Sequence, residues 1–213
     1  PILNLALGGT TTYEILCPTG FTPPGGRPAP DTAHNITKAL SLNPDAIIIN
    51  LPSNDAAAGF SVQEQQDNYE RTMALANQSH VPVWVASSQP RNLNQSGRDN
   101  LVTMRDWIFA RFGSRAVDFW STLATSNGSI NTFFDFGDGI HVNNFGHHIL
   151  YTRVVGKQIL DTLCILTNDA PQPKAGADQV IKLPQNSATL NGSSSADPDG
   201  SIALNRWKKI AGP

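Results

Sequence analysis

The sequence predicts an α/β domain over residues 1–167, in which a parallel sheet is covered by helices on both faces. Short apolar segments of strand length alternate along this region with amphipathic helical patterns. The strand segments are continuously apolar, which is typical of strands buried on both faces of a parallel sheet. The helical segments carry apolar residues on one face only, so each can cover a sheet.

The expected strands are short, and turn-forming residues follow the first two. We expect strands over residues 2–7, 45–51, 81–86 and 116–119. Gly8 and Gly9 end the first strand, and Pro52 ends the second. In a parallel sheet, ligands bind beyond the carboxyl ends of the strands, so the loops after these segments are the places to look for chemistry.

Capping residues and apolar stripes locate the expected helices. Asp31 follows a proline and is expected to cap a helix with Ile36 and Leu40 on one face. Ser61 and Glu64 form a capping box at the start of a second helix. A third helix is expected around residues 101–112. The last one carries a long apolar stripe: Phe145, Ile149, Thr152, Val155, Ile159 and Leu163.

The composition and the hydrophobic pattern of the sequence change after Thr167. Residues 168–174 have the composition of a linker, and residues 175–213 show a β pattern with a strong turn at 197–200. About forty residues supply about three strands, too few for an independent sandwich. We therefore expect a truncated all-β segment, and we expect the chain to be cut at both ends.

The amino-acid composition disfavours some classes of function. Lys and Arg total 15 and Asp and Glu total 17, so no basic surplus favours a nucleic-acid partner. No apolar run approaches the roughly 20 residues of a transmembrane helix. Charged residues make up 15%, against about 25% in typical domains. This polar, weakly charged composition favours a secreted or cell-surface protein. Cys17 and Cys164 allow one disulfide at most, and the sequence leaves that pairing open.

Three weak chemical signals follow the expected strands. Asp138 precedes His141 by three residues across a glycine, so it can fold back and bond Nδ1, or it can simply cap the following helix. Asn54 follows the most apolar strand, where its amide can serve as an oxyanion donor or as an ordinary turn residue. Gly9 allows a backbone N–H to approach a substrate closely, or it forms a plain turn.

Together these signals resemble the SGNH (GDSL-like) hydrolase family. Residues 4–11, Asn-Leu-Ala-Leu-Gly-Gly-Thr-Thr, look like its second sequence block. Residues 52–55, Pro-Ser-Asn-Asp, look like its third, and residues 138–141, Asp-Gly-Ile-His, look like its fifth. The resemblance covers residues 1 to about 165. It implies a flavodoxin-like three-layer α/β/α fold and ester hydrolysis without a cofactor.

The resemblance also implies roles for individual residues. His141 would be the general base and Asp138 its orienting partner. The Gly9 N–H and the Asn54 side chain would share the oxyanion hole. Pro52 departs from the family, which usually has glycine there, but it leaves Asn54 in register.

The family's first block, which carries the nucleophilic serine, has no counterpart here. We expect the nucleophile to lie upstream of Pro1, so the family's first strand would be absent too. Residues 2–7 and 45–51 would then lose their shared neighbour, leaving either a gap between them or a direct pairing. Serines elsewhere in the chain are not credible substitutes, because they are adjacent to the oxyanion asparagine or follow a different strand: Ser53, Ser87 and Ser88.

Other polar residues are expected to be structural. Gln89 and Arg91 can touch substrate, whereas Asp55 is expected to bond local backbone. The remaining histidines are isolated or cap and pack a helix rather than bind metal: His34, His80, His147 and His148. Asp197 and Asp199 fit a turn better than a calcium site. No metal site is expected.

Residues 175–213 resemble the first half of a PKD-like β-sandwich module, a companion of secreted bacterial carbohydrate-active enzymes and adhesins. The sequence therefore predicts a secreted, bacterial serine esterase of the SGNH type, present without its nucleophile. Its expected substrates are small-molecule or polysaccharide esters with acetyl or other short acyl groups. A lysophospholipase, a thioesterase, an O-acyltransferase and a non-catalytic binding or adhesion protein remain as alternatives.

Overall fold

The computed structural model describes residues 1–51, 53–164, 170–198 and 201–211. It divides into two compact units, Pro1–Leu163 and Cys164–Pro213. Pro52, the linker residues 168 and 169, and the turn residues 199 and 200 lie outside the described residues, so the expectations for them stay predictions. The same holds for the side chain of Cys164. Cys17 is a free thiol.

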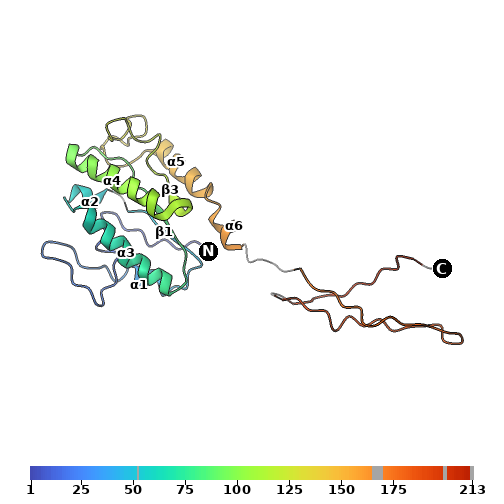
Figure 1. Ribbon diagram of the computed structural model, residues 1–213. Coiled ribbons are helices and arrows are strands. Elements are labelled where there is room, and N and C mark those ends of the chain that lie inside the picture. Colours follow the sequence, from blue (N-terminus) through green and yellow to red (C-terminus); the bar gives the residue numbers. More distant parts are fainter. Residues whose placement is uncertain (52, 165–169, 199–200, 212–213) are drawn as a thin grey trace. The chain divides into compact units, whose positions relative to one another are not determined.

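A three-stranded parallel sheet lies at the centre of the first unit (Figure 1). Its strands, in spatial order, are β1 (Ile47–Ile49), β2 (Val83–Ala86) and β3 (Ala116–Val117). Ile48 pairs with Trp84, and Val85 pairs with Ala116. Each strand falls within a range that the sequence predicted, and all run parallel, so the expected α/β class is confirmed.

Residues 2–7 form no strand, so the prediction there is wrong. They have no ladder hydrogen bonds in the described structure, and Ile2 is 96% exposed. β1 pairs with β2 on one edge and with no described residue on the other. Ile48 is also exposed, so β1 is not buried on both faces as predicted. A strand requires a neighbour to receive its backbone groups, and residues 2–7 have none. Residues 2–7 do not pair with β1, so the direct pairing that we gave as one alternative is not found in the described structure.

Helices cover both faces of the sheet. They are α1 (Ile36–Leu40), α2 (Asn54–Ala57), α3 (Val62–Gln78), α4 (Gln95–Phe112), α5 (Asn144–Val155) and α6 (Ile159–Cys164), with a short 3-10 turn at Gly113–Arg115. The capping box of α3 is confirmed: the Ser61 hydroxyl accepts from the Glu64 N–H, and the Glu64 carboxylate accepts from the Ser61 N–H. Gly113 ends α4 with a φ of +54°.

Two helix predictions need correction. α1 starts at Ile36 and is capped by Asn35, because Asp31 instead accepts from the Ala33 N–H and holds a turn before the helix. The last stripe does not form one continuous helix, since Gln158 adopts a φ of +48° between α5 and α6. Three members of that stripe are exposed rather than buried: Phe145, Thr152 and Val155.

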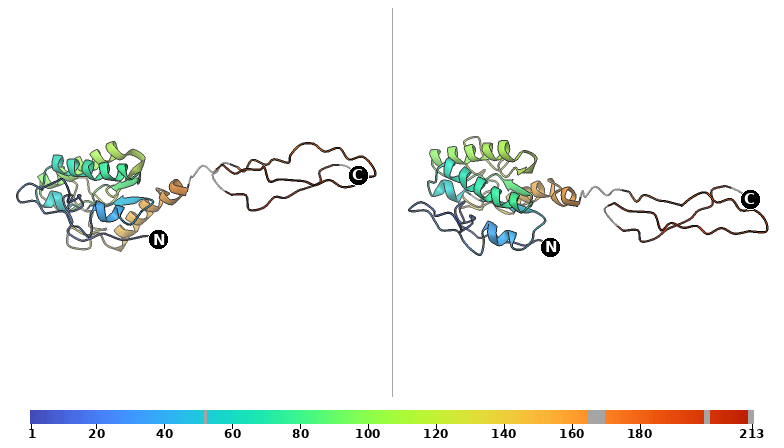
Figure 2. Two further views of the ribbon diagram at one scale, coloured as in Figure 1. Left: turned by 90° about the horizontal axis from the view of Figure 1, so that it is seen from below. Right: turned by 60° about the horizontal axis from the view of Figure 1, so that its bottom comes forward.

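The side chains of β2 alternate between two cores. Val83 and Val85 pack in a cluster with α3 and α4, whereas Trp84 and Ala86 pack in a second cluster that includes Leu150 of α5. Figure 2 shows α3 and α4 side by side. The sheet is therefore a middle layer, and its loops at the carboxyl end are held from both faces.

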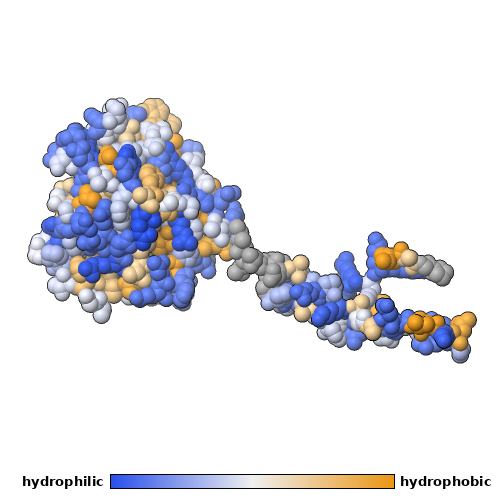
Figure 3. Space-filling model, in the orientation of Figure 1, coloured by the Kyte–Doolittle hydropathy of each residue, from blue (hydrophilic) through white to orange (hydrophobic). Residues whose placement is uncertain are grey.

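The second unit has little regular structure. Its described residues contain one isolated antiparallel bridge, Gln172 with Ala196, and no helix apart from the last residue of α6. Its apolar side chains are on the surface (Figure 3), among them Val180, Leu183 and Ile210. The strands expected here are not assigned, because so few segments cannot bury one another's apolar faces. No helix in the described part of the chain is long and apolar enough to span a bilayer.

Candidate active site

Asp138 and His141 face each other across a tight turn. The Asp138 Oδ2 lies 2.6 Å from His141 Nδ1, and its Oδ1 accepts from the backbone N–H groups of Ile140 and His141, each at 2.8 Å. Because the carboxylate accepts these hydrogen bonds, the pKa of Asp138 is held well below its usual range. Asp138 is thus an ionised acceptor for the His141 ring.

This contact fixes the state of the imidazole. An ionised carboxylate only accepts hydrogen bonds, so His141 Nδ1 carries the proton that it donates to Asp138. His141 Nε2 is then the basic nitrogen, and the side chain is 69% exposed. The pair has the orientation that allows Nε2 to take a proton while Asp138 stabilises the resulting charge.

Gly139 is required by this turn. Its φ is +70°, and a Cβ at this position would lie 2.7 Å from the side-chain nitrogen of Asn92. The Asn92 N–H donates to the Gly139 carbonyl at 2.8 Å, and the Gln89 side chain donates to the Ile140 carbonyl at 2.7 Å. The loop after β2 therefore supports the turn that carries His141. Gln89, one of the two side chains that can touch substrate according to the sequence, holds this turn.

Asn54 is fixed by two hydrogen bonds at the start of α2. Its Nδ2 donates to the Thr10 carbonyl at 3.0 Å, and its Oδ1 accepts from Arg91 Nη1 at 3.3 Å. A side-chain amide has two N–H groups, so the second Nδ2–H of Asn54 is still available to a ligand. Asn54 thus has a fixed amide with one free donor.

Gly9 lies next to the residue that Asn54 contacts. It is exposed, with a φ of +86°, and its N–H has no hydrogen-bond partner among the described residues. Hydrogen bonds thus connect four loops in sequence, from residues 8–12 through Asn54 and residues 89–92 to residues 139–141. The structure links the predicted pair of Asp138 and His141 to the predicted donors through these loops.

Asp55 makes a contact that sequence reasoning missed. Its carboxylate accepts from the Thr12 N–H at 3.1 Å and from the Thr12 hydroxyl at 2.6 Å. Asn68 donates to the same hydroxyl at 3.0 Å. Desolvation raises the pKa of Asp55 to about 6. Thr12 is 43 residues away, so this bond is not a local one. Asp55 anchors the loop that carries Gly9.

Three serines lie close to these loops, and two of them form hydrogen bonds with the backbone. Ser53, Ser87 and Ser88 are all buried. The Ser87 hydroxyl accepts from the Phe119 N–H at 2.9 Å, and the Ser88 hydroxyl donates to the Gln89 carbonyl at 3.3 Å. A nucleophile needs an open hydroxyl beside its base, and these serines do not provide one.

The other histidines lie apart from this site. His147 and His148 are exposed on α5, and Asn143 caps that helix, so neither histidine is the cap. The expected packing role is confirmed for His148, whose ring stacks on that of Tyr151 with centroids 6.4 Å apart. His34 pairs with Asp31 at 2.8 Å. Within the described ranges, no group of three or more His, Cys, Asp or Glu side chains is placed to hold a metal ion.

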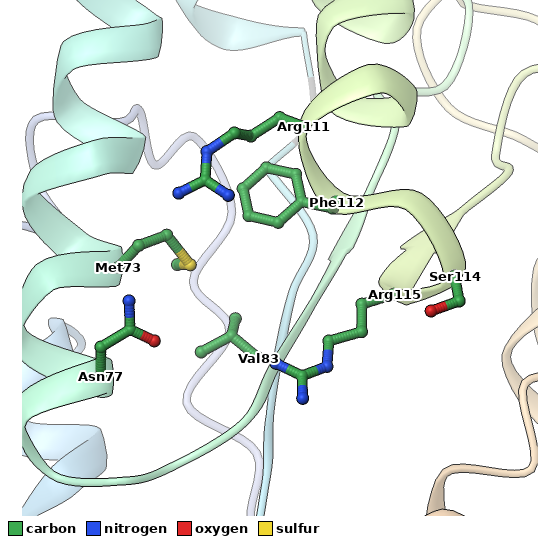
Figure 4. A pocket seen from close by; sticks show the side chains of 7 residues that line it. All are labelled: Met73, Asn77, Val83, Arg111, Phe112, Ser114 and Arg115. Carbon is green, nitrogen blue, oxygen red and sulfur yellow. The ribbon is translucent and has the colours of Figure 1, made fainter.

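A pocket of about 250 Å³ lies at the other end of the sheet (Figure 4). It is lined by Met73, Asn77, Val83, Arg111, Phe112, Ser114 and Arg115. Val83 is the first residue of β2, so this pocket opens at the amino end of the strands. Arg111 there is already paired with Glu70 at 2.6 Å. Ligands of parallel α/β sheets bind at the opposite edge, where hydrogen bonds connect the loops that carry His141 and Asn54.

Solved structures share the architecture of the first unit. A candidate acylhydrolase from Bacteroides fragilis matches with a TM-score of 0.52 and 19% identity over 60% of this chain and 66% of its own. A GDSL-like lipase from Bacteroides thetaiotaomicron matches with a TM-score of 0.52 and 18% identity over 59% and 66%. The N-terminal unit has the GDSL-like hydrolase fold. The match spans just under two thirds of each of these chains.

The GDSL-like fold is followed by a second recognisable segment. Residues 175–213 match the family model of the K319L-like PKD domain. The suspected combination of a GDSL-like unit with a PKD-like module is thereby confirmed. In the GDSL-like unit, the loops after β1 and β2 hold the Asp138–His141 pair and the fixed amide of Asn54 at the carboxyl edge, where this class of fold binds ligands.

Proposed function

We propose that this chain is the main part of a serine ester hydrolase. The observation that carries the proposal is the His141–Asp138 pair, whose exposed Nε2 is basic and whose turn is tied by hydrogen bonds to the loops of Asn54 and Gly9. A general base and two donors for a developing negative charge are what acyl transfer requires.

The proposed reaction proceeds by acyl transfer in two steps. His141 Nε2 takes the proton of a serine hydroxyl as the serine oxygen attacks the ester carbonyl carbon. The carbonyl oxygen becomes an oxyanion, which receives hydrogen bonds from the Gly9 N–H and the free Nδ2–H of Asn54. The imidazolium, stabilised by Asp138, gives its proton to the leaving alcohol. Water then repeats the sequence on the acyl-serine and releases the carboxylic acid.

The nucleophilic serine is proposed to precede residue 1 in the longer protein. Two observations support this assignment. The serines near the candidate site are buried, and the outer edge of β1 has no strand partner among the described residues. A strand placed at that edge would carry its following loop to the same carboxyl edge as Asn54.

The proposed substrates are acetyl or other short-acyl esters of carbohydrates, acted on outside a bacterial cell. The PKD-like match at residues 175–213 and the low fraction of charged residues, 15%, support this setting. No step of the proposed reaction uses a cofactor.

Hydrolysis of p-nitrophenyl acetate by the full-length protein tests the proposal. We expect turnover that His141→Ala abolishes and that His147→Ala, a change at an exposed histidine of α5, leaves unchanged. The 213-residue chain should show no turnover. His141-dependent turnover by the 213-residue chain would place the nucleophile within it. Absence of activity on acetyl to decanoyl esters would refute the proposed reaction.

A further inference from the structure

Exposed phenylalanines flank the candidate base in the sequence. Phe136 is 72% exposed, and Phe133 and Phe145 are also exposed. Phe133 and Phe145 contact each other, with ring centroids 5.4 Å apart. Removing the surface of a large aromatic side chain from water is favourable. An exposed ring close to a reactive histidine therefore indicates a surface that contacts a ligand.

The backbone pairing places Phe136 directly opposite His141. Asp135 and Val142 form an antiparallel bridge, and the Phe136 N–H donates to the His141 carbonyl at 2.8 Å. Directly opposite residues in an antiparallel pair have their side chains on the same face. Val142, the next residue along, is buried. Phe136 and His141 therefore project together from the outer face of this hairpin.

The proposed chemistry decides which part of an ester meets this face. The protonated His141 gives its proton to the departing alcohol, so the alcohol oxygen lies within hydrogen-bond distance of Nε2. The carbonyl oxygen points instead toward Gly9 and Asn54. A side chain opposite His141 is consequently placed to contact the alcohol part of the ester rather than its acyl part.

The exposure of the Phe136 ring favours a ligand with a flat apolar face. Phe136 has most of its surface in solvent, so no neighbouring side chains form walls that would enclose an alkyl chain. A sugar ring has a flat face of C–H groups that can lie against an open aromatic ring, with its hydroxyl groups pointing to the side.

We propose that Phe136 is the specificity-determining platform on which a sugar ring, the alcohol part of the ester, packs during hydrolysis. This inference rests on the proposed esterase function. It goes further by assigning the alcohol side of the substrate to the outer face of the 135–142 hairpin.

The kinetic test compares two acetate esters in the full-length protein. Phe136→Ala should lower kcat/KM for acetylated methyl glucoside by about tenfold, which is the size of one lost aromatic contact, and change that for ethyl acetate by less than about twofold. Phe136→Trp should retain the preference for the sugar ester. Leu160→Ala removes an apolar side chain that is also 72% exposed but lies on α6, and it should leave both values unchanged.

Three other outcomes would contradict the inference. Equal losses on both esters would mean that Phe136 only supports the His141 turn. With octyl acetate as a third substrate, a loss confined to that ester would mean that the surface binds an alkyl chain. If the full-length protein hydrolyses no ester, titration of the 213-residue chain with methyl glucoside decides the matter by NMR. Shifts of the Phe136 ring signals that are saturable and specific to the sugar support the platform, and their absence overturns it.

Discussion

Replacing the buried Asp55 by Asn should change how the stability of the protein depends on pH. Asp55 is 2% exposed, and desolvation raises its pKa from the ordinary 3.8 to about 6. The folded state therefore holds this proton more tightly than the unfolded state does. The stability that this provides is fully present below about pH 3.8 and is lost as the pH rises through about 6.

The size of the effect follows from the two pKa values. A rise from 3.8 to about 6 corresponds to about 3 kcal/mol of unfolding free energy. Asn has nearly the same shape, and its oxygen can still accept the Thr12 N–H, but it does not ionise. Because pH 4 already lies above 3.8, part of this contribution is lost there, and the stability of Asp55→Asn relative to the wild type should increase by about 2 kcal/mol between pH 4 and pH 7.

Urea unfolding of the 213-residue chain at several pH values between 4 and 7 measures this difference. Subtracting the variant from the wild type removes the contributions of the other carboxylates, including Glu64, whose pKa is lowered to about 2 mainly by its hydrogen bond with Arg27. Asp99→Asn, a change at an exposed residue of α4, is the matched control and should show no comparable trend. A difference that stays flat for Asp55→Asn would refute the reasoning.

Three further predictions concern catalysis and helix capping. In the full-length protein, Asn54→Ala should lower kcat by roughly 10²–10³-fold with little change in KM, because one oxyanion donor is lost; unchanged kinetics would remove Asn54 from the site. Asp138→Asn should lower kcat by about 10⁴-fold, because an amide favours the wrong His141 tautomer, and a loss below about tenfold would contradict this role. Ser61→Ala should destabilise the chain by about 1 kcal/mol in urea unfolding, because the α3 capping box is lost; Ser96→Ala, at an exposed serine within α4, should not match that loss.

Local patterns predicted much of the fold. The capping box at Ser61 and the apolar stripes of α3 and α4 depend on residues close in sequence, so these helices could be located. The stripe around Phe145 failed because its period shows that a helix forms but not which face is covered. Residues 2–7 failed for a related reason, since an apolar segment becomes a strand only if another strand pairs with it.

In the candidate site too, contacts between residues close in sequence could be predicted, whereas contacts between distant residues could not. Asp138 and His141 are three residues apart, so their contact could be expected from the chain alone. The bond from Thr12 to Asp55 spans 43 residues and depends on how the loops meet. The position of Phe136 opposite His141 depends on the register of the hairpin, and nothing in the residue types specified that register.

Labelling with a fluorophosphonate tests the central claim most directly, because this reagent reacts with a serine only when a base activates it. Peptide mass spectrometry of the labelled full-length protein should find one modified serine, located before residue 1. The label should be lost in His141→Ala and retained in His147→Ala. No labelled serine, or a label that persists without His141, would contradict the assignment of His141 as the base of a serine hydrolase.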